Sequence, residues 1–323
     1  MSHPGPSVTP LRRAGRRVAL VPAAVCATLM LAACSTSSPT TSAAAGGSAA
    51  GKPITVVATI NAWGSIAAQL GGTRVRETSI ITNPATDPHT YEPTPTDARA
   101  VAGADVFIQN GMGYDPWATK MLAANPVPGR GVLDVGELVG IADGGNPHRW
   151  YSPTDVRAVV DQITADYAKT DPADKAYFEQ RKSAFLTTDL ATYNDLIAAI
   201  RAKYTGVKVG ASESIFSPMA QALGLDLVTP ASFLTAISQG TDVSAADKAT
   251  IDQQISSKQI KVYVFNSQNS TPDVAAQVAA AKAAAIPVVA VTETLSPAGA
   301  RFQQWQSEQL QQLAAALHMA TGR

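Results

Sequence analysis

Two of the three histidines that follow residue 34 lie in the same local setting. Pro88-His89-Thr90-Tyr91 and Pro147-His148-Arg149-Trp150 each place proline directly before the histidine and an aromatic residue two positions after it. Proline fixes the backbone and lowers the entropy that is lost when a ligand-bearing loop becomes ordered. Because imidazole is a common metal ligand, the repeated pattern predicts that His89 and His148 bind a metal ion. His318, near the end of a terminal amphipathic helix, is interpreted as a surface residue.

The second half of the chain offers two glutamates as counterparts of the two histidines in the first half. Glu213 comes just after a predicted strand at 207–211, and Glu293 just after one at 287–291. In open parallel sheets, ligands bind beyond the carboxyl ends of the strands. Two donors from each half would therefore converge if the halves face each other. Two imidazoles and two carboxylates suit Mn²⁺, Fe²⁺ and Zn²⁺ alike.

Both cysteines lie near the start of the chain, so we expect no sulfur ligand. Four arginines between residues 12 and 17 precede an apolar stretch at 18–33, and no acidic residue occurs before Cys34. This pattern is typical of a secretory signal. Leu31-Ala32-Ala33-Cys34 resembles a lipobox, which predicts a signal peptide at 1–33 and a lipid on Cys34. We expect a lipoprotein anchored to the outer face of the cell membrane, with no free thiol after cleavage.

The composition describes an ordered, weakly acidic protein. The chain has 323 residues, 46% of them hydrophobic and only 15% charged, which favours two folded domains over disorder. The predicted cleavage removes four of 25 basic residues and leaves 21 against 25 acidic residues, a net charge of −4. Binding to nucleic acid depends on neutralising phosphates, so we expect no nucleic-acid partner.

Short apolar runs alternate with helical stretches from residue 54 onward, after a Ser-, Thr-, Ala- and Gly-rich tether at 34–53. The alternation predicts an α/β fold of two (β/α)₄ lobes with parallel sheets. The predicted strands of the N-terminal lobe, residues 54–170, are 54–60, 75–81, 105–110 and 131–135. Those of the C-terminal lobe, residues 205–323, are 207–211, 225–229, 261–266 and 287–291.

One long rigid helix is predicted to join the lobes over residues 171–204. Asp171-Pro172 offers an N-cap followed by proline at the first helical position, and no proline or glycine follows before Lys203. Aromatic and aliphatic residues recur there at spacings that suit an amphipathic helix. A helix of roughly thirty residues is about 45 Å long, at 1.5 Å per residue.

The segment 83–97 around His89, the run 104–111, the segment 146–153 around His148 and the run 291–295 together resemble a known family. They are similar to the solute-binding lipoproteins of zinc and manganese ABC importers, and the similarity covers nearly all of the chain after residue 53. The resemblance implies two (β/α)₄ lobes bridged by a long helix, with one ion at their interface. It also implies a monomer that delivers its ion to a permease with an ATPase.

Carried over residue by residue, the resemblance gives His89, His148, Glu213 and Glu293 as the metal ligands. The third ligand of the family is often histidine in zinc members and glutamate in manganese members, and here it is Glu213. The fourth is usually aspartate, whereas Glu293 has one more methylene. A histidine-rich loop found in many zinc members is absent. Manganese and zinc therefore both remain open as the ion.

Two other functions are compatible with the same residues. Two histidines and a glutamate could form the site of a secreted zinc hydrolase, and a bound metal could also stabilise a surface adhesin. All four donors are committed to the metal, and no His-Glu-x-x-His motif or spare base is present, so we expect no enzymatic activity. Five further residues near the histidines are interpreted as caps, surface charges or packing: Asp87, Glu92, Asp97, Tyr114 and Trp150.

Overall fold

The computed structural model describes residues 51–86 and 90–323. The predicted signal peptide, Cys34 and His89 lie outside these residues. Within the described ranges, none of the helices combines the length and apolar character needed to span a membrane.

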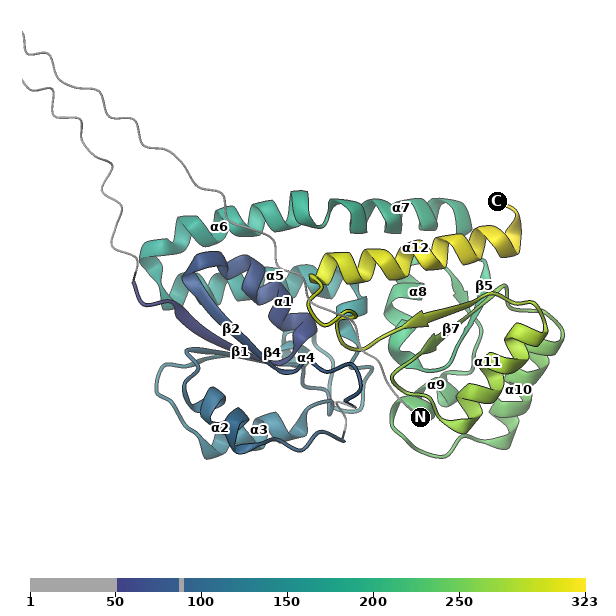
Figure 1. The fold of residues 1–323 in the computed structure, drawn as a ribbon, viewed down its shortest axis with the longest axis horizontal. Helices are drawn as coiled ribbons and strands as arrows, with labels where there is room; N and C mark the ends of the chain where they lie inside the picture. The colour runs from purple at the N-terminus through teal and green to yellow at the C-terminus, as the bar shows by residue number, and fades with distance from the viewer. Residues whose placement is uncertain (1–50, 87–89) are drawn as a thin grey trace, which may run out of the picture. The chain divides into compact units, whose positions relative to one another are not determined.

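The N-terminal half forms one parallel four-stranded sheet (Figure 1). Its order is β2-β1-β3-β4, so the chain starts in the middle of the sheet and then extends it on both sides. β1 is a run of β-branched and apolar residues, and it is almost entirely buried, as expected for a central parallel strand. The strands are β1 (Ile54–Ile60), β2 (Val75–Ile81), β3 (Val106–Gln109) and β4 (Gly131–Asp134).

Helices connect these strands and cover the sheet. Before α2, the Thr94 side chain accepts a hydrogen bond from the Asp97 backbone N–H and the Asp97 carboxylate accepts one from that of Thr94. This capping box confirms that Asp97 caps a helix. The helices are α1 (Asn61–Gly71), α2 (Pro95–Ala102), α3 (Pro116–Ala124), α4 (Val135–Val139) and α5 (Pro153–Thr170).

The C-terminal half repeats the architecture with a second parallel sheet in the order β6-β5-β7-β8. This confirms the predicted α/β fold with two four-stranded parallel sheets. The strands are β5 (Lys208–Ala211), β6 (Asp226–Leu227), β7 (Val262–Asn266) and β8 (Val288–Val291). The helices are α8 (Ser217–Leu223), α9 (Ala231–Ser238), α10 (Ala245–Ser256), α11 (Pro272–Ala283) and α12 (Phe302–Thr321).

The second predicted strand of this half was too long, because β6 has two residues where 225–229 was expected. Val228 still donates its N–H to the Val209 carbonyl at 3.0 Å. At Thr229 a side-chain hydrogen bond replaces the backbone pairing of the strands, because the Thr229 hydroxyl accepts the Ala211 N–H at 3.0 Å. Pro230 then leads directly into α9, a helix that the apolar pattern did not predict.

The connection between the sheets is helical but is not one uninterrupted α-helix. A 3₁₀ turn at Pro172–Asp174 precedes α6 (Lys175–Ala184), and a π turn at Phe185–Asp189 separates it from α7 (Ala191–Tyr204). Leu190 donates its N–H to the Phe185 carbonyl, five residues back, at 2.9 Å. An α-helix would place Phe185 and Leu190 roughly 140° apart around its axis, whereas both are buried here. The prediction of a single uninterrupted helix was therefore wrong. The π turn changes the helical register so that the side chains of Phe185 and Leu190 both face the core.

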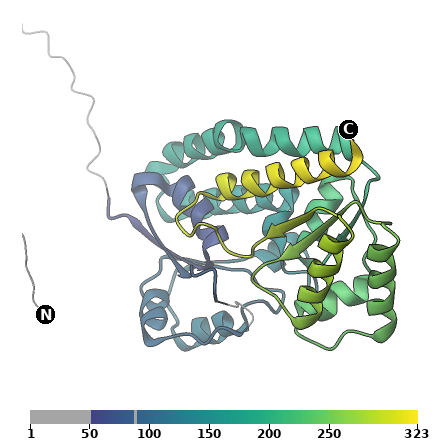
Figure 2. The same cartoon turned by 45° about the vertical axis from the view of Figure 1, so that its right-hand side comes forward.

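The connecting segment crosses both sheets, and the last helix runs beside the second half of this segment. Figures 1 and 2 show α6 and α7 above the two sheets, with α12 packed along α7. One hydrophobic cluster extends from β1 through α5 and α7 to α12. The two sheets therefore share a continuous core and belong to one compact unit.

Candidate metal centre

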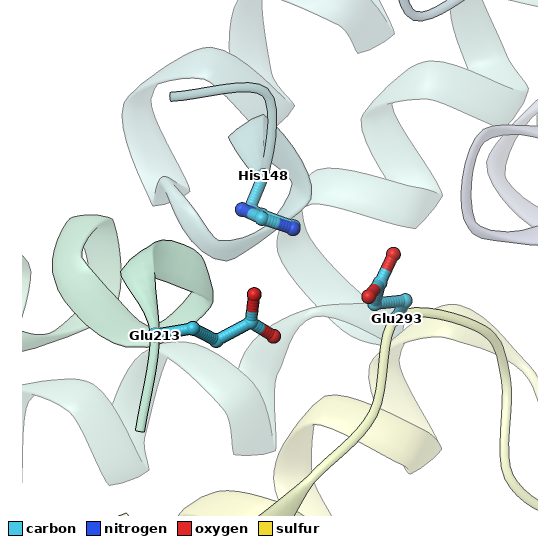
Figure 3. Close-up of side chains that lie close together, drawn as sticks. All are labelled: His148, Glu213 and Glu293. Carbon is cyan, nitrogen blue, oxygen red and sulfur yellow. The ribbon is translucent and has the colours of Figure 1, made fainter. Parts of the chain in front are cut away.

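Three of the four predicted ligands meet between the two sheets (Figure 3). His148 precedes the short 3₁₀ turn that leads into α5, Glu213 follows β5, and Glu293 follows β8. Each offers a ligand atom, and these atoms all lie within 4.8 Å of one another. The exposed fractions of the three residues are 0%, 0% and 2%. The fourth predicted ligand, His89, lies outside the described residues, so its place in the site remains a prediction.

The local fold fixes the imidazole of His148. Asn146 accepts the His148 backbone N–H at 3.1 Å, and the same Oδ1 lies 2.9 Å from His148 Nδ1. The Asn146 amide nitrogen donates to the Ser214 carbonyl at 2.7 Å, which settles the orientation of the amide. Since Oδ1 can only accept, Nδ1 carries the proton and the ring lone pair lies on Nε2. This is the arrangement by which proteins orient a metal-binding histidine.

Aromatic rings surround the same imidazole. The ring centroids of Tyr114 and Trp150 lie 6.2 and 5.3 Å from that of His148, both in edge-on geometry. The predicted packing role of both aromatics is confirmed. Tyr114 also donates its hydroxyl to Glu293 Oε2 at 2.8 Å, a contact that the sequence did not indicate.

Glu213 bears the electrostatic cost of this buried arrangement. Burial, together with the negative charge of Glu293, raises the pKa of Glu213 to about 8. Asn266, Asn269 and Ser238 lie near the carboxylate and favour its ionised form, but they do not outweigh burial. Glu213 Oε2 is buried and makes no hydrogen bond of normal geometry within the described ranges. Two buried carboxylates beside an oriented imidazole make a site that a divalent cation would stabilise.

Asn266 is the residue that sequence reasoning missed. It ends β7, the strand between β5 and β8, and its amide nitrogen donates to both Glu213 Oε1 and Glu293 Oε1, the latter at 2.8 Å. The rule that selected the two glutamates, a polar residue at the carboxyl end of a parallel strand, also applies to this asparagine.

A small cavity of about 150 Å³ adjoins the site between the two halves. Its lining includes Tyr114, Asn146, Pro147 and Ser214, which neighbour or contact the three converging residues. The cavity is partly open, so solvent reaches the loops that carry the three converging residues although their side chains are buried.

Residues 56–316 match the model of a protein family described as zinc-uptake complex component A, periplasmic. The chain belongs to this family. That membership confirms the resemblance to the family that the sequence indicated.

Characterised relatives of this zinc-uptake family differ in the ion that their names give. The chain is 26% identical over 186 residues to the manganese-binding lipoprotein MntA of Halalkalibacterium halodurans. It is 24% identical over 200 residues to the high-affinity zinc uptake system protein ZnuA of Bacillus subtilis. Each alignment covers 55% of this chain, which spans only 60% of the length of either relative.

Solved structures share the fold over a longer stretch. A crystal structure of ZnuA superposes with a TM-score of 0.66 at 22% identity, covering 83% of this chain and 99% of that one. A manganese-bound periplasmic metal-binding protein from Candidatus Liberibacter asiaticus gives 0.69 at 19% identity, covering 82% and 99%. At these identities the likeness establishes the fold, which is the two-sheet architecture described above.

Proposed function

We propose that this chain is the extracytoplasmic solute-binding lipoprotein of an ABC transporter that imports a divalent transition metal. The observation that carries the proposal is the convergence of His148, Glu213 and Glu293 from three separate segments on both sides of the interface. A buried imidazole beside two buried carboxylates has little structural value without a cation, because burying like charges is costly. Family membership supports uptake as the purpose of the site.

His89 is proposed as the fourth ligand. It shares the Pro-His-x-aromatic pattern with His148 and follows β2 of the same sheet. The resulting donor set is two nitrogens and two carboxylate groups, which suits Mn²⁺ and Zn²⁺. Relatives named for manganese and for zinc support the same pair of ions.

The remaining parts of the proposal concern location and partners. A lipid on Cys34 would hold the protein at the outer face of the cell membrane, with residues 34–53 as tether. The two lobes, 54–170 and 205–323, with the connecting segment 171–204, would act as a monomer that passes its ion to a permease driven by an ATPase. Several relatives are named as substrate-binding lipoproteins of metal ABC transporters, which supports these partners.

Metal stoichiometry tests the ligand set. We expect one Zn²⁺ or Mn²⁺ per wild-type chain, and a loss of binding in His89→Ala and His148→Ala, because each removes a donor that no neighbour replaces. His318→Ala is the matched control and should bind as the wild type does, since His318 lies on the exposed side of α12. Metal analysis after gel filtration measures the result. If His148→Ala retains one tightly bound ion per chain, the assignment is wrong.

Metal affinity should rise with pH. A cation binds ionised Glu213, whose pKa is raised to about 8 by burial and by Glu293. Below that pH, binding must displace a proton, so the dissociation constant should fall about tenfold for each pH unit between 6 and 8. Competition titrations with a chelator of known pH dependence measure this slope. A flat profile would show that Glu213 does not ionise on binding.

A growth experiment separates import from adhesion or hydrolysis. A strain that lacks the protein should fail to grow when zinc or manganese is scarce, and added metal should restore growth. Normal growth under metal limitation, with loss of surface attachment, would favour the adhesin instead. Turnover of an ester or amide substrate by the metal-loaded protein would favour the hydrolase.

A further inference from the structure

Asn266 holds the two carboxylates of the candidate metal centre through one nitrogen atom. Its amide nitrogen carries two hydrogens, and it donates to Oε1 of Glu213 and to Oε1 of Glu293. The Asn266 side chain is fully buried, so no solvent competes for these hydrogen bonds. The amide thereby fixes the spacing of two groups that would otherwise repel each other.

The orientation of this amide is determined by its surroundings. Asn266 Oδ1 accepts the backbone N–H of Gln268 at 2.9 Å, so the nitrogen must face the carboxylates. The backbone N–H of Asn266 donates to the hydroxyl of Ser212, directly before Glu213, at 3.0 Å. The donor is therefore held in place from both sides before any ion binds.

Three of the four carboxylate oxygens of Glu213 and Glu293 accept a hydrogen bond from Asn266 or Tyr114, and the fourth does not. Both oxygens of Glu293 have partners, Asn266 at Oε1 and the Tyr114 hydroxyl at Oε2. In Glu213, Oε1 is held by Asn266, whereas Oε2 makes no hydrogen bond of normal geometry with a described residue. A carboxylate that binds an ion through both oxygens must turn both toward it, and these contacts oppose that rotation.

We propose that Asn266 sets the metal selectivity of the site by restraining Glu213 and Glu293 to one oxygen ligand each. This rests on the proposed function, since it presumes that the site binds a metal. One oxygen from each carboxylate keeps the coordination number low, which suits tetrahedral Zn²⁺. Mn²⁺ favours oxygen-rich sites with more ligands and would need the second oxygens. Asn266 is a positioning residue, and it biases the site toward zinc.

The test compares Zn²⁺ and Mn²⁺ binding in the wild type and in Asn266→Ala. Without the amide, Glu213 can turn to bind through both oxygens and Glu293 Oε1 is released, while the Tyr114 hydroxyl still holds Glu293 Oε2. The preference for Zn²⁺ over Mn²⁺, measured as the ratio of dissociation constants by competition, should fall about ten- to a hundredfold. Asn266→Leu, which fills the same space without a donor, should change the ratio in the same direction if the alanine variant folds poorly.

Cobalt provides a readout that a merely structural role would not change. Four-coordinate Co²⁺ absorbs visible light far more strongly than six-coordinate Co²⁺, so the wild-type complex should be intensely coloured and the Asn266→Ala complex pale. Ser267→Ala is the matched control, because the neighbouring exposed serine contacts neither carboxylate. It should retain both the wild-type ratio and the wild-type spectrum.

The outcomes distinguish this proposal from the one on which it rests. An unchanged ratio and cobalt spectrum in both Asn266 variants would overturn the role of Asn266 and leave metal binding intact. A pale wild-type cobalt complex would overturn the low coordination number. A wild-type chain that binds none of the three ions would overturn the proposed function, and the selectivity proposal with it.

Discussion

Replacing Glu213 with glutamine should abolish tight metal binding and at the same time stabilise the metal-free protein. Glutamine retains the shape of the side chain and an oxygen that can accept from Asn266. It lacks the negative charge that binds a cation, so we expect metal affinity to fall by more than about a hundredfold, beyond the loss typical of residues outside the ligand shell. The gain in stability follows from the same missing charge.

The sign of the stability change follows from proton linkage. The pKa of Glu213 is raised from 4.5 to about 8 in the folded protein, so the folded chain holds a proton that the unfolded chain loses between those values. The free energy of unfolding therefore falls as the pH rises from about 4.5 to about 8. Glutamine removes this contribution, so the variant should exceed the wild type in stability by at least about 2 kcal/mol at pH 8.

Chemical denaturation of both metal-free proteins at pH 5 and pH 8 measures this difference. The advantage of Glu213→Gln should be large at pH 8 and small at pH 5, where wild-type Glu213 is already protonated. Glu308→Gln, the same change on the exposed face of α12, is the control. It should leave the free energy of unfolding unchanged at both pH values. A Glu213→Gln protein less stable than the wild type at pH 8 would contradict the electrostatic cost assigned to this site.

Trp150→Ala should be the most destabilising single substitution next to the metal centre. Trp150 is fully buried, and its ring lies 6.2 Å from Trp63 and 5.3 Å from both Tyr114 and His148, all edge-on. Removing the indole leaves a cavity that this packed region cannot close, which costs about 3–5 kcal/mol. The imidazole of His148 and the Tyr114 hydroxyl on Glu293 would also lose support, so metal affinity should fall with stability.

Trp150→Phe separates packing from hydrogen bonding at the same position. The indole N–H is buried and has no hydrogen-bond partner among residues 51–86 and 90–323, so its loss should cost nothing. Phenylalanine preserves most of the aromatic contact, and we expect a loss of about 1–2 kcal/mol with metal binding retained. Thermal or urea unfolding of the three proteins checks the order. Equal losses in both variants would indicate that the indole N–H, and not the ring volume, is the important group.

The sequence by itself determined the class of the fold and three members of the candidate site. A central parallel strand is buried on both faces, so β1 appears as a short continuous apolar run and was predicted with the bounds that it has. The edge strand β2, which mixes β-branched with polar residues, was also predicted with its bounds. Glu213 and Glu293 were found because polar residues just after such strands meet at one edge of a sheet. His148 was found because the proline before it restricts the backbone of its loop.

The tertiary structure alone decided how these residues are held. Asn266 and the hydroxyl of Tyr114 act on Glu293 from segments 27 and 179 residues away in the chain, and no local pattern records such a distance. The π turn at Phe185–Asp189 likewise depends on tertiary packing, because it allows Phe185 and Leu190 to be buried in the core together. Local periodicity reports which face of an element is buried, whereas the partners of a buried polar group depend on how distant elements pack. The convergence of His148, Glu213 and Glu293 could therefore be predicted from the sequence, but the spacing of these side chains, their protonation and the hydrogen bonds that hold their oxygens could not.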